Sequence, residues 1–131
     1  MEAEGLITIS EAGEKLGVSA KTLRRLCNLG LVPGVRRDYR RRRVFSDGQV
    51  DHMRTLLGLR RAGFSNRELR SFVWMCRQGR GTLPKRKATL ETQKRQLWKE
   101  LQARQEGIDF LERQIELIDK ALAKYPADTK K

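Results

Sequence analysis

The carboxy-terminal third of the chain constrains its folding more than any other feature. Gly79-Arg80-Gly81 interrupts the chain, and after Pro84 no proline occurs until Pro126. Residues 84–125 are therefore predicted to form one helix of 42 residues, with Thr82 as a candidate cap. At about 1.5 Å per residue this helix is roughly 63 Å long. A helix of that length cannot bury an apolar stripe against itself.

An apolar seam with heptad spacing runs along the predicted helix. Nine of the eleven a and d positions from Leu90 to Tyr125 are apolar or aromatic, and Lys94 and Arg104 are the exceptions. The predicted dimerisation residues are Leu90, Leu97, Leu101, Ile108, Leu111, Ile115, Ile118 and Leu122. This pattern predicts a coiled coil, and because no second long helix is present, the expected partner is another copy. The alternative is that the helix folds back on its own head.

The length and the glycine break define the expected organisation. A chain of 131 residues and 15.2 kDa forms one domain, or one domain with an appendage, and is too short for a multi-domain enzyme. We expect a head over residues 1–78, a linker over 79–83, the coiled-coil helix over 84–125 and a tail over 126–131.

The charge balance indicates a polyanionic partner. Lys and Arg number 29 against 16 Asp and Glu, which gives a net charge of +13, and residues 1–80 carry +9 of it. Six arginines fall within eight positions, and they are Arg36, Arg37, Arg40, Arg41, Arg42 and Arg43. Such density is unfavourable unless phosphates neutralise it, so nucleic acid is the leading partner. The alternative is a solvated loop whose charges are redundant.

Several other classes of protein are disfavoured. No apolar run is long enough for a membrane span and the amino terminus is acidic, so we expect a soluble, cytoplasmic protein without a membrane partner. Cys27 and Cys76 lie far apart without a CxxC motif, so neither a metal site nor a disulfide framework is predicted. With His52 as the single histidine and no phosphate loop or nucleophile motif, we expect neither an enzyme nor a cofactor.

Two short helices near the amino terminus have the pattern of a helix-turn-helix. Ser10 is a candidate cap for a helix ending at Leu16, and Gly17-Val18-Ser19 then forms a turn. Ser19 caps a second helix, Ala20 to about Asn28.

The second of these helices is amphipathic. Leu23, Leu26 and Cys27 face inward, and the opposite face presents Ala20, Lys21, Arg24, Arg25 and Asn28. A basic helix of this size fits a DNA major groove. The alternative is an ordinary helical bundle with a charged solvent face.

A hairpin, called the wing below, and two further helices complete the predicted head. Strands over residues 35–37 and 42–45 flank a polar turn, with Val44 expected on one face and Arg43 and Phe45 on the other. Capping-box patterns at Ser46 and Ser65 begin two more helices. The predicted fold is thus mainly α: a winged helix-turn-helix head with a small β-hairpin wing, and a long coiled-coil helix after it.

Six segments, in this order and spacing, resemble the winged helix-turn-helix of MerR-type transcription regulators. They are Ile7-Thr8-Ile9-Ser10-Glu11-Ala12, Leu16-Gly17-Val18-Ser19, Thr22-Leu23-Arg24, Gly30-Leu31-Val32-Pro33, Arg43-Val44-Phe45-Ser46 and Leu59-Arg60-Arg61-Ala62-Gly63-Phe64-Ser65. The resemblance covers about residues 7–78. The chain departs from the family in two places: Arg25-Leu26-Cys27 stand where two aromatics and an acid are usual, and Arg41-Arg42 where Gly-Tyr is usual.

The resemblance implies a function and roles for single residues. It implies a homodimer with antiparallel long helices that binds a pseudo-palindromic operator in double-stranded DNA and distorts the promoter for RNA polymerase. Arg24 matches the family's phosphate-contacting arginine, Ala20 and Lys21 match base-reading positions, and Arg43 matches the wing arginine. The predicted DNA-binding residues are these four with Ser19, Arg25, Arg36, Arg37, Arg40, Arg41 and Arg42.

The sequence leaves open which effector, if any, the protein senses and which function it performs on DNA. A small ligand near Trp74, Met75 and Trp98, a thiol switch at Cys76, a protein partner, or no effector are all compatible with the sequence. The alternative functions are a DNA-architectural or excisionase-like protein without promoter activation, a thiol-responsive regulator, and a coiled-coil adaptor for acidic proteins. RNA binding is disfavoured because no aromatic stacking platform interleaves the basic residues.

Overall fold

A computed structural model of the chain describes residues 5–125. The chain divides into two compact units, Met1–Thr89 and Leu90–Lys131, and each is described by itself. The predicted tail over residues 126–131 lies outside the described residues. Among residues 5–125, no helix has the length and apolar character that crossing a membrane requires.

The first helical pair forms as expected, with one correction at its start. Helices α1 (Ile9–Leu16) and α2 (Ala20–Asn28) pack together. Thr8, and not Ser10, caps α1: its side chain accepts from the backbone N–H of Glu11, whose carboxylate in turn accepts from the Thr8 N–H at 2.8 Å. Thr8 is the better cap because Glu11 lies three residues beyond it, which completes a capping box.

The turn between α1 and α2 depends on a close backbone approach at Gly13. The Val18 N–H donates to the Gly13 carbonyl over 3.0 Å. A β-carbon at Gly13 would lie 2.7 Å from the Val18 carbonyl oxygen, which is closer than two such atoms can pack. Gly17 ends α1 with a φ of 71°, as its glycine predicted.

The wing belongs to a three-stranded antiparallel sheet in which β3 (Arg43–Phe45) lies between β1 (Ile7–Thr8) and β2 (Arg36–Arg37). The sequence pattern predicted the hairpin of β2 and β3 but not β1, because two residues are too short to show a strand pattern. Val44 and Phe45, which were expected on opposite faces of β3, are both buried, so both faces of this strand are covered. As the central strand, β3 contacts both α1 and α3.

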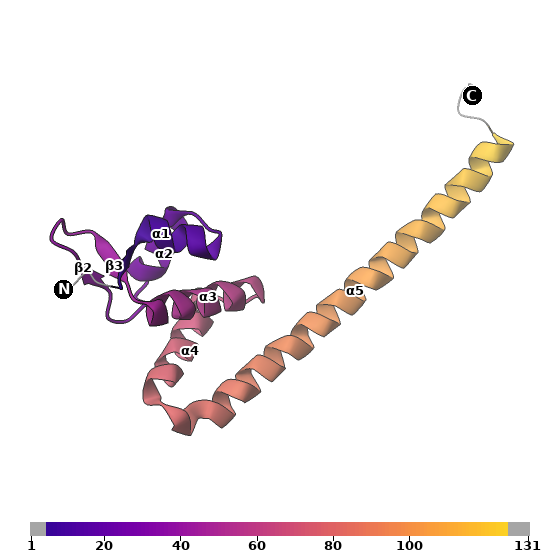
Figure 1. The fold of residues 1–131 in the computed structure, drawn as a ribbon. Helices are drawn as coiled ribbons and strands as arrows, with labels where there is room; N and C mark the ends of the chain where they lie inside the picture. Colours follow the sequence, from indigo (N-terminus) through magenta and orange to yellow (C-terminus); the bar gives the residue numbers. More distant parts are fainter. Residues whose placement is uncertain (1–4, 126–131) are drawn as a thin grey trace. The chain divides into compact units, whose positions relative to one another are not determined.

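Helices α3 (Asp47–Arg61) and α4 (Asn66–Gln78) begin at the two predicted capping boxes, at Ser46 and Ser65. Their inner faces join α2 and β3 in one core, which Figure 1 shows as the cluster of short elements in the amino-terminal unit. The fully buried large side chains of this core are Leu23, Leu26, Leu31, Phe45, Met53, Leu56 and Leu69.

A short 3₁₀ turn, η1 (Arg80–Thr82), leads into helix α5 (Leu83–Lys124), which has the predicted 42 residues but begins and ends one residue earlier than predicted. The Thr82 hydroxyl lies 2.7 Å from the Met75 carbonyl and 2.8 Å from that of Gly79. Arg86 donates to the Thr82 hydroxyl at 2.9 Å and to the Gly79 carbonyl at 3.0 Å. These contacts attach the first turns of α5 to the end of α4.

Candidate nucleic-acid interface

The outer face of α2 is basic and open. Lys21, Arg24 and Arg25 are exposed, and among residues 5–125 no acidic side chain pairs with them. Ser19 caps the helix by accepting from the Thr22 N–H at 3.2 Å. Because Leu23 and Leu26 on the opposite face are buried, the helix is held in the core while its cations face solvent.

Asp38 organises the turn of the wing. Its carboxylate accepts from the backbone N–H groups of Arg40 and Arg42, each at 2.9 Å, and from the Arg42 guanidinium at 3.0 Å. These bonds, with that from the Arg42 N–H foremost, lower the pKa of Asp38 below its ordinary value. The Asp38 side chain is only 9% exposed. A single carboxylate therefore fixes the backbone that presents the arginines.

Arg41 has a left-handed backbone conformation, with a φ of 66°, and is the one non-glycine residue with a positive φ among residues 5–125. Its N–H donates to the Asp38 carbonyl at 2.8 Å, and its own carbonyl accepts from the Arg37 guanidinium at 2.8 Å. A β-carbon disfavours this region by about 1–2 kcal/mol. The MerR-type regulators that the chain resembles usually have glycine at this position. The wing therefore keeps the backbone conformation that glycine favours, although the residue is an arginine.

Three arginines of the wing make contacts within the head, and the first of them is the bond from Arg37 to the Arg41 carbonyl described above. Arg42 pairs with Asp38, as described above, and Arg43 donates to the Asn28 side-chain oxygen at 2.8 Å. Because Asn28 is the last residue of α2, the Arg43 bond connects the wing to the end of that helix.

The other wing cations face outward. Arg36, Arg40 and Arg41 are exposed, and no acidic side chain of the described chain pairs with them. The Arg40 guanidinium lies 5.6 Å from the ring centroid of Tyr39, which is 87% exposed. The outward cations, together with the aromatic ring at the tip, are available to a nucleic-acid backbone.

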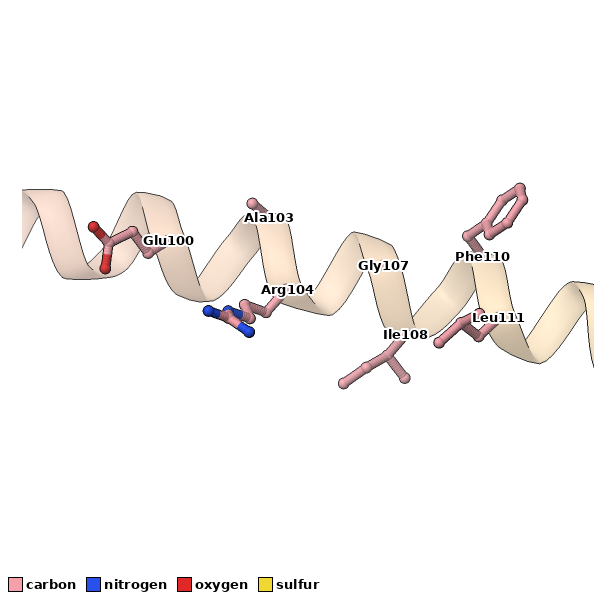
Figure 2. A pocket seen from close by; sticks show the side chains of 7 residues that line it. All are labelled: Glu100, Ala103, Arg104, Gly107, Ile108, Phe110 and Leu111. Atoms are coloured by element: carbon pink, nitrogen blue, oxygen red, sulfur yellow. The ribbon is translucent and has the colours of Figure 1, made fainter.

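The predicted seam on α5 is apolar and exposed within its own unit. From Leu90 to Leu122 the eight predicted dimerisation residues are 37–59% exposed. Figure 2 shows Arg104, Ile108 and Leu111 on one side of the helix, with Ala103 and Phe110 on another. Phe110 and Leu117 are also more than half exposed and extend the apolar surface beyond the heptad pattern that predicted it.

The residues considered as sensors are divided between several environments. Cys76 is partly buried against the core, and its sulfur accepts from the Arg86 guanidinium at 3.7 Å. His52 bonds the Leu31 carbonyl at 2.8 Å, which agrees with a structural role. Trp74 and Trp98 are each more than 60% exposed within their own units, whereas Met75 is buried. Burial raises the pKa of the other thiol, Cys27.

Three contributors to this surface were missed from the sequence. Gly13 permits the tight helix-turn-helix, Asp38 shapes the wing, and Arg60 of α3 lines a pocket beside Lys21 and Arg25. Asp38 had a recognisable signal, because aspartate often bonds the backbone two residues ahead in turns. The roles of Gly13 and Arg60 depend on packing between elements and have no local pattern.

Comparisons with known proteins agree with this geometry. The MerR HTH family of regulatory proteins matches residues 7–73, about half of the chain. An uncharacterized HTH-type transcriptional regulator of Haemophilus influenzae is 30% identical over 116 residues, which are 88% of this chain and 86% of that protein.

Two solved structures show the same fold. HiNmlR, a MerR family regulator lacking the sensor domain and bound to promoter DNA, is 30% identical, with a TM-score of 0.73 over 90% of this chain and 94% of that one. The N-terminal part of MtaN, the Bacillus subtilis multidrug transporter activator, is 25% identical, with a TM-score of 0.65 over 83% of this chain and 97% of that one. The chain therefore belongs to the MerR family, and it is a DNA-binding transcription regulator of the helix-turn-helix type.

Proposed function

We propose that the protein acts as a homodimer that binds a pseudo-palindromic operator within a promoter and distorts the DNA to control transcription. The observation that carries this proposal is that the open basic face of α2 and the outward arginines of the wing belong to one compact unit with a single core. HiNmlR, which has the same fold over most of its length, is bound to promoter DNA, and this supports promoter DNA as the ligand here.

Each part of the head has a distinct role in the proposal. Ala20 and Lys21, at the start of α2, read base edges, and Arg24 contacts a phosphate. The wing arginines contact the DNA backbone that flanks the bases. Bending and twisting a site of this size costs on the order of 1–6 kcal/mol, and phosphate contacts from two wings offset that cost. RNA polymerase at the distorted promoter is the proposed partner in transcription.

The exposed seam of α5 supports the proposed dimer. Fully burying one leucine or isoleucine side chain stabilises by about 1.5–3 kcal/mol. Eight such residues that are roughly half exposed support a stable association with the same seam of a second copy. The partner helix is proposed to run antiparallel, which would place two heads at the two ends of the coil.

Footprinting on the DNA upstream of the protein's own gene tests the proposal. We expect a protected palindrome between promoter elements and enhanced cleavage at its centre, where the DNA is distorted. Protection without a palindrome would favour an architectural or excisionase-like protein, and no protection would favour an adaptor for acidic proteins.

A thiol response is a second candidate function, because the Cys76 sulfur contacts Arg86. Alkylation of that sulfur would displace the guanidinium from the Gly79 carbonyl and the Thr82 hydroxyl, and so loosen the α4–α5 junction. A Cys27→Ser protein treated with iodoacetamide should then bind operator DNA differently from the untreated protein. Unchanged binding after complete alkylation would exclude this response.

A further inference from the structure

Three positively charged side chains, called the seam cations below, interrupt the apolar seam of α5. When the heptad is continued back to the start of the helix, Lys87 and Lys94 occupy a positions and Arg104 occupies a d position. All three are exposed, and among residues 5–125 no acidic side chain forms an ion pair with them. A second copy on the seam would cover them, and covering a cation without a counter-charge is unfavourable. The partner helix is therefore expected to supply acidic groups.

Parallel pairing of two α5 helices cannot supply these groups. In an in-register parallel coiled coil, each a or d residue faces the same residue of the partner. Lys87, Lys94 and Arg104 would each face their own copy, which brings like charges together in three layers of the core. In an antiparallel coil an a residue instead faces a d residue, and e and g residues flank the contact. The seam cations therefore favour antiparallel helices.

The acidic residues beside the seam select one antiparallel register. The e and g positions of α5 hold four of them, and these are Glu91, Glu100, Glu112 and Asp119. Because an a residue must face a d residue, the possible registers differ by whole heptads. One register places Leu83 opposite Leu122 of the partner subunit and sets an acidic residue beside every seam cation. The resulting pairs are Lys87 with the partner's Asp119, Lys94 with the partner's Glu112 and Arg104 with the partner's Glu100.

The two neighbouring registers are worse in charge or in overlap. A shift of one heptad in one direction places Lys94 opposite the partner's Arg104, so two cations meet in the core. A shift in the other direction places Arg104 beside the partner's Gly107, without an acidic neighbour. In that register Leu83, which is 52% exposed, faces a position beyond the end of α5. The register that pairs Leu83 with Leu122 thus matches both the charges and the length of the helix.

The central turns of α5 carry a surface that suits this partner. An open groove of about 830 Å³ follows them, and Glu100, Arg104 and Ile108 are among the residues that line it (Figure 2). Glu100 and Arg104 lie one turn apart, yet within the described chain they form no ion pair with each other. Both charges therefore remain available to a second helix. In the selected register the partner's Leu97 faces Ile108, and the partner's Leu101 faces Arg104.

We propose that two copies of α5 pair antiparallel in the register that places Leu83 opposite Leu122 of the partner subunit, with Lys94 and the partner's Glu112 as an ion pair beside the core. The inference rests on the proposed dimer and adds the register to it. Because Leu83 and Leu122 are 39 residues apart, this register separates the starts of the two helices by roughly 59 Å along the coil. The seam cations would therefore determine how far apart the two heads are held.

Exchanging the two charges tests the proposed ion pair in the full chain. Glu112→Lys should weaken dimerisation about tenfold, because two attractive pairs per dimer become repulsive. Lys94→Glu combined with Glu112→Lys restores the attraction with reversed signs, so it should recover most of the wild-type affinity. Glu106→Lys is the matched control, since Glu106 is exposed at an outer f position, and it should leave the affinity unchanged. Sedimentation equilibrium measures the dimer dissociation constants.

Paired cysteines test the register without altering any charge. Leu83→Cys with Leu122→Cys should give a disulfide-linked dimer on mild oxidation, because the two positions face each other across the coil. Leu90→Cys with Leu122→Cys should not, since these positions are offset by one heptad, about 10 Å. The wild type, oxidised in parallel, reports any bridge through Cys27 or Cys76. Non-reducing gel electrophoresis measures the linked fraction.

The outcomes separate the register from the dimer itself. Equal or preferential linkage of the Leu90→Cys/Leu122→Cys protein would overturn the register and leave the proposed dimer intact. The same holds for an exchange variant that dimerises as weakly as Glu112→Lys alone. A wild type that is monomeric at micromolar concentration would contradict the proposed function, and with it this inference.

Discussion

Arg41 combines an unfavourable backbone conformation with an outward charge, and two substitutions separate these properties. Arg41→Ala removes the guanidinium and keeps the β-carbon at a φ of 66°. Arg41→Gly removes the guanidinium and the β-carbon together. The difference in stability between the two variants therefore reports the cost of the backbone conformation. The change in DNA binding that both variants share, relative to the wild type, reports the contribution of the charge.

The backbone effect can be estimated from two opposing costs. A β-carbon in the left-handed region costs about 1–2 kcal/mol, whereas glycine loses about 0.5–1 kcal/mol more than alanine in conformational entropy on folding. The net gain of Arg41→Gly over Arg41→Ala is thus about 0.75 kcal/mol per wing, the difference between the midpoints of these two ranges. In a cooperatively unfolding head of fewer than a hundred residues, this corresponds to a rise in Tm of roughly 3–6 °C.

The charge effect appears in the salt dependence of DNA binding. If Arg41 contacts a phosphate in each half of the complex, both variants should make the slope of log K against log salt shallower by about 1.8 per dimer. Differential scanning fluorimetry and fluorescence anisotropy measure the two effects on the same samples. Equal Tm values for the glycine and alanine variants would refute the strain argument, and an unchanged slope would show that Arg41 is solvated.

Three further predictions concern the α5 seam, the outer face of α2 and the thiol of Cys27. Replacing Leu111 and Ile115 with Glu should give monomers by sedimentation at micromolar concentration and a loss of operator affinity, because the charges fall in the seam; a wild-type monomer that binds DNA fully would contradict the dimer. Arg24→Ala should weaken binding to all sequences alike, whereas Lys21→Ala should change the consensus in a binding-site selection, and an unchanged consensus would remove Lys21 from base reading. Because burial raises the pKa of Cys27, the unfolded chain ionises this thiol first as pH rises, so stability should fall above the ordinary thiol range. Cys27→Ser should remove this loss of stability at alkaline pH, which is measured as the free energy of unfolding from urea titrations.

Local patterns predicted most helices of the head, because the residues that cap or end a helix lie next to it in the sequence. The capping boxes at Ser46 and Ser65 predicted the starts of α3 and α4, and Ser19 predicted the start of α2. The error at Ser10 is instructive, since hydroxyl residues at positions 8 and 10 both precede an amphipathic stretch. Only Thr8 has a glutamate three residues later to complete the reciprocal bond.

Features that depend on distant residues could not be predicted in the same way. Strand β1 exists because Ile7 pairs with Phe45, far along the chain. The run of arginines looked uniform in sequence, yet Asp38 and Asn28 engage two of them and leave others open. Charge density alone predicted nucleic acid as the ligand, but it could not show which cations are available to bind it.

The bonds of Arg86 decide where the chain can be shortened. The family match ends at residue 73, but a fragment cut there would lose the end of α4 with Met75, a buried core residue. A fragment that runs to Thr89 retains Arg86 and its acceptors, and it lacks the whole seam from Leu90 onward. If the full protein dimerises through that seam as proposed, such a fragment would be a single head that binds one half of the operator, without the second head of the dimer.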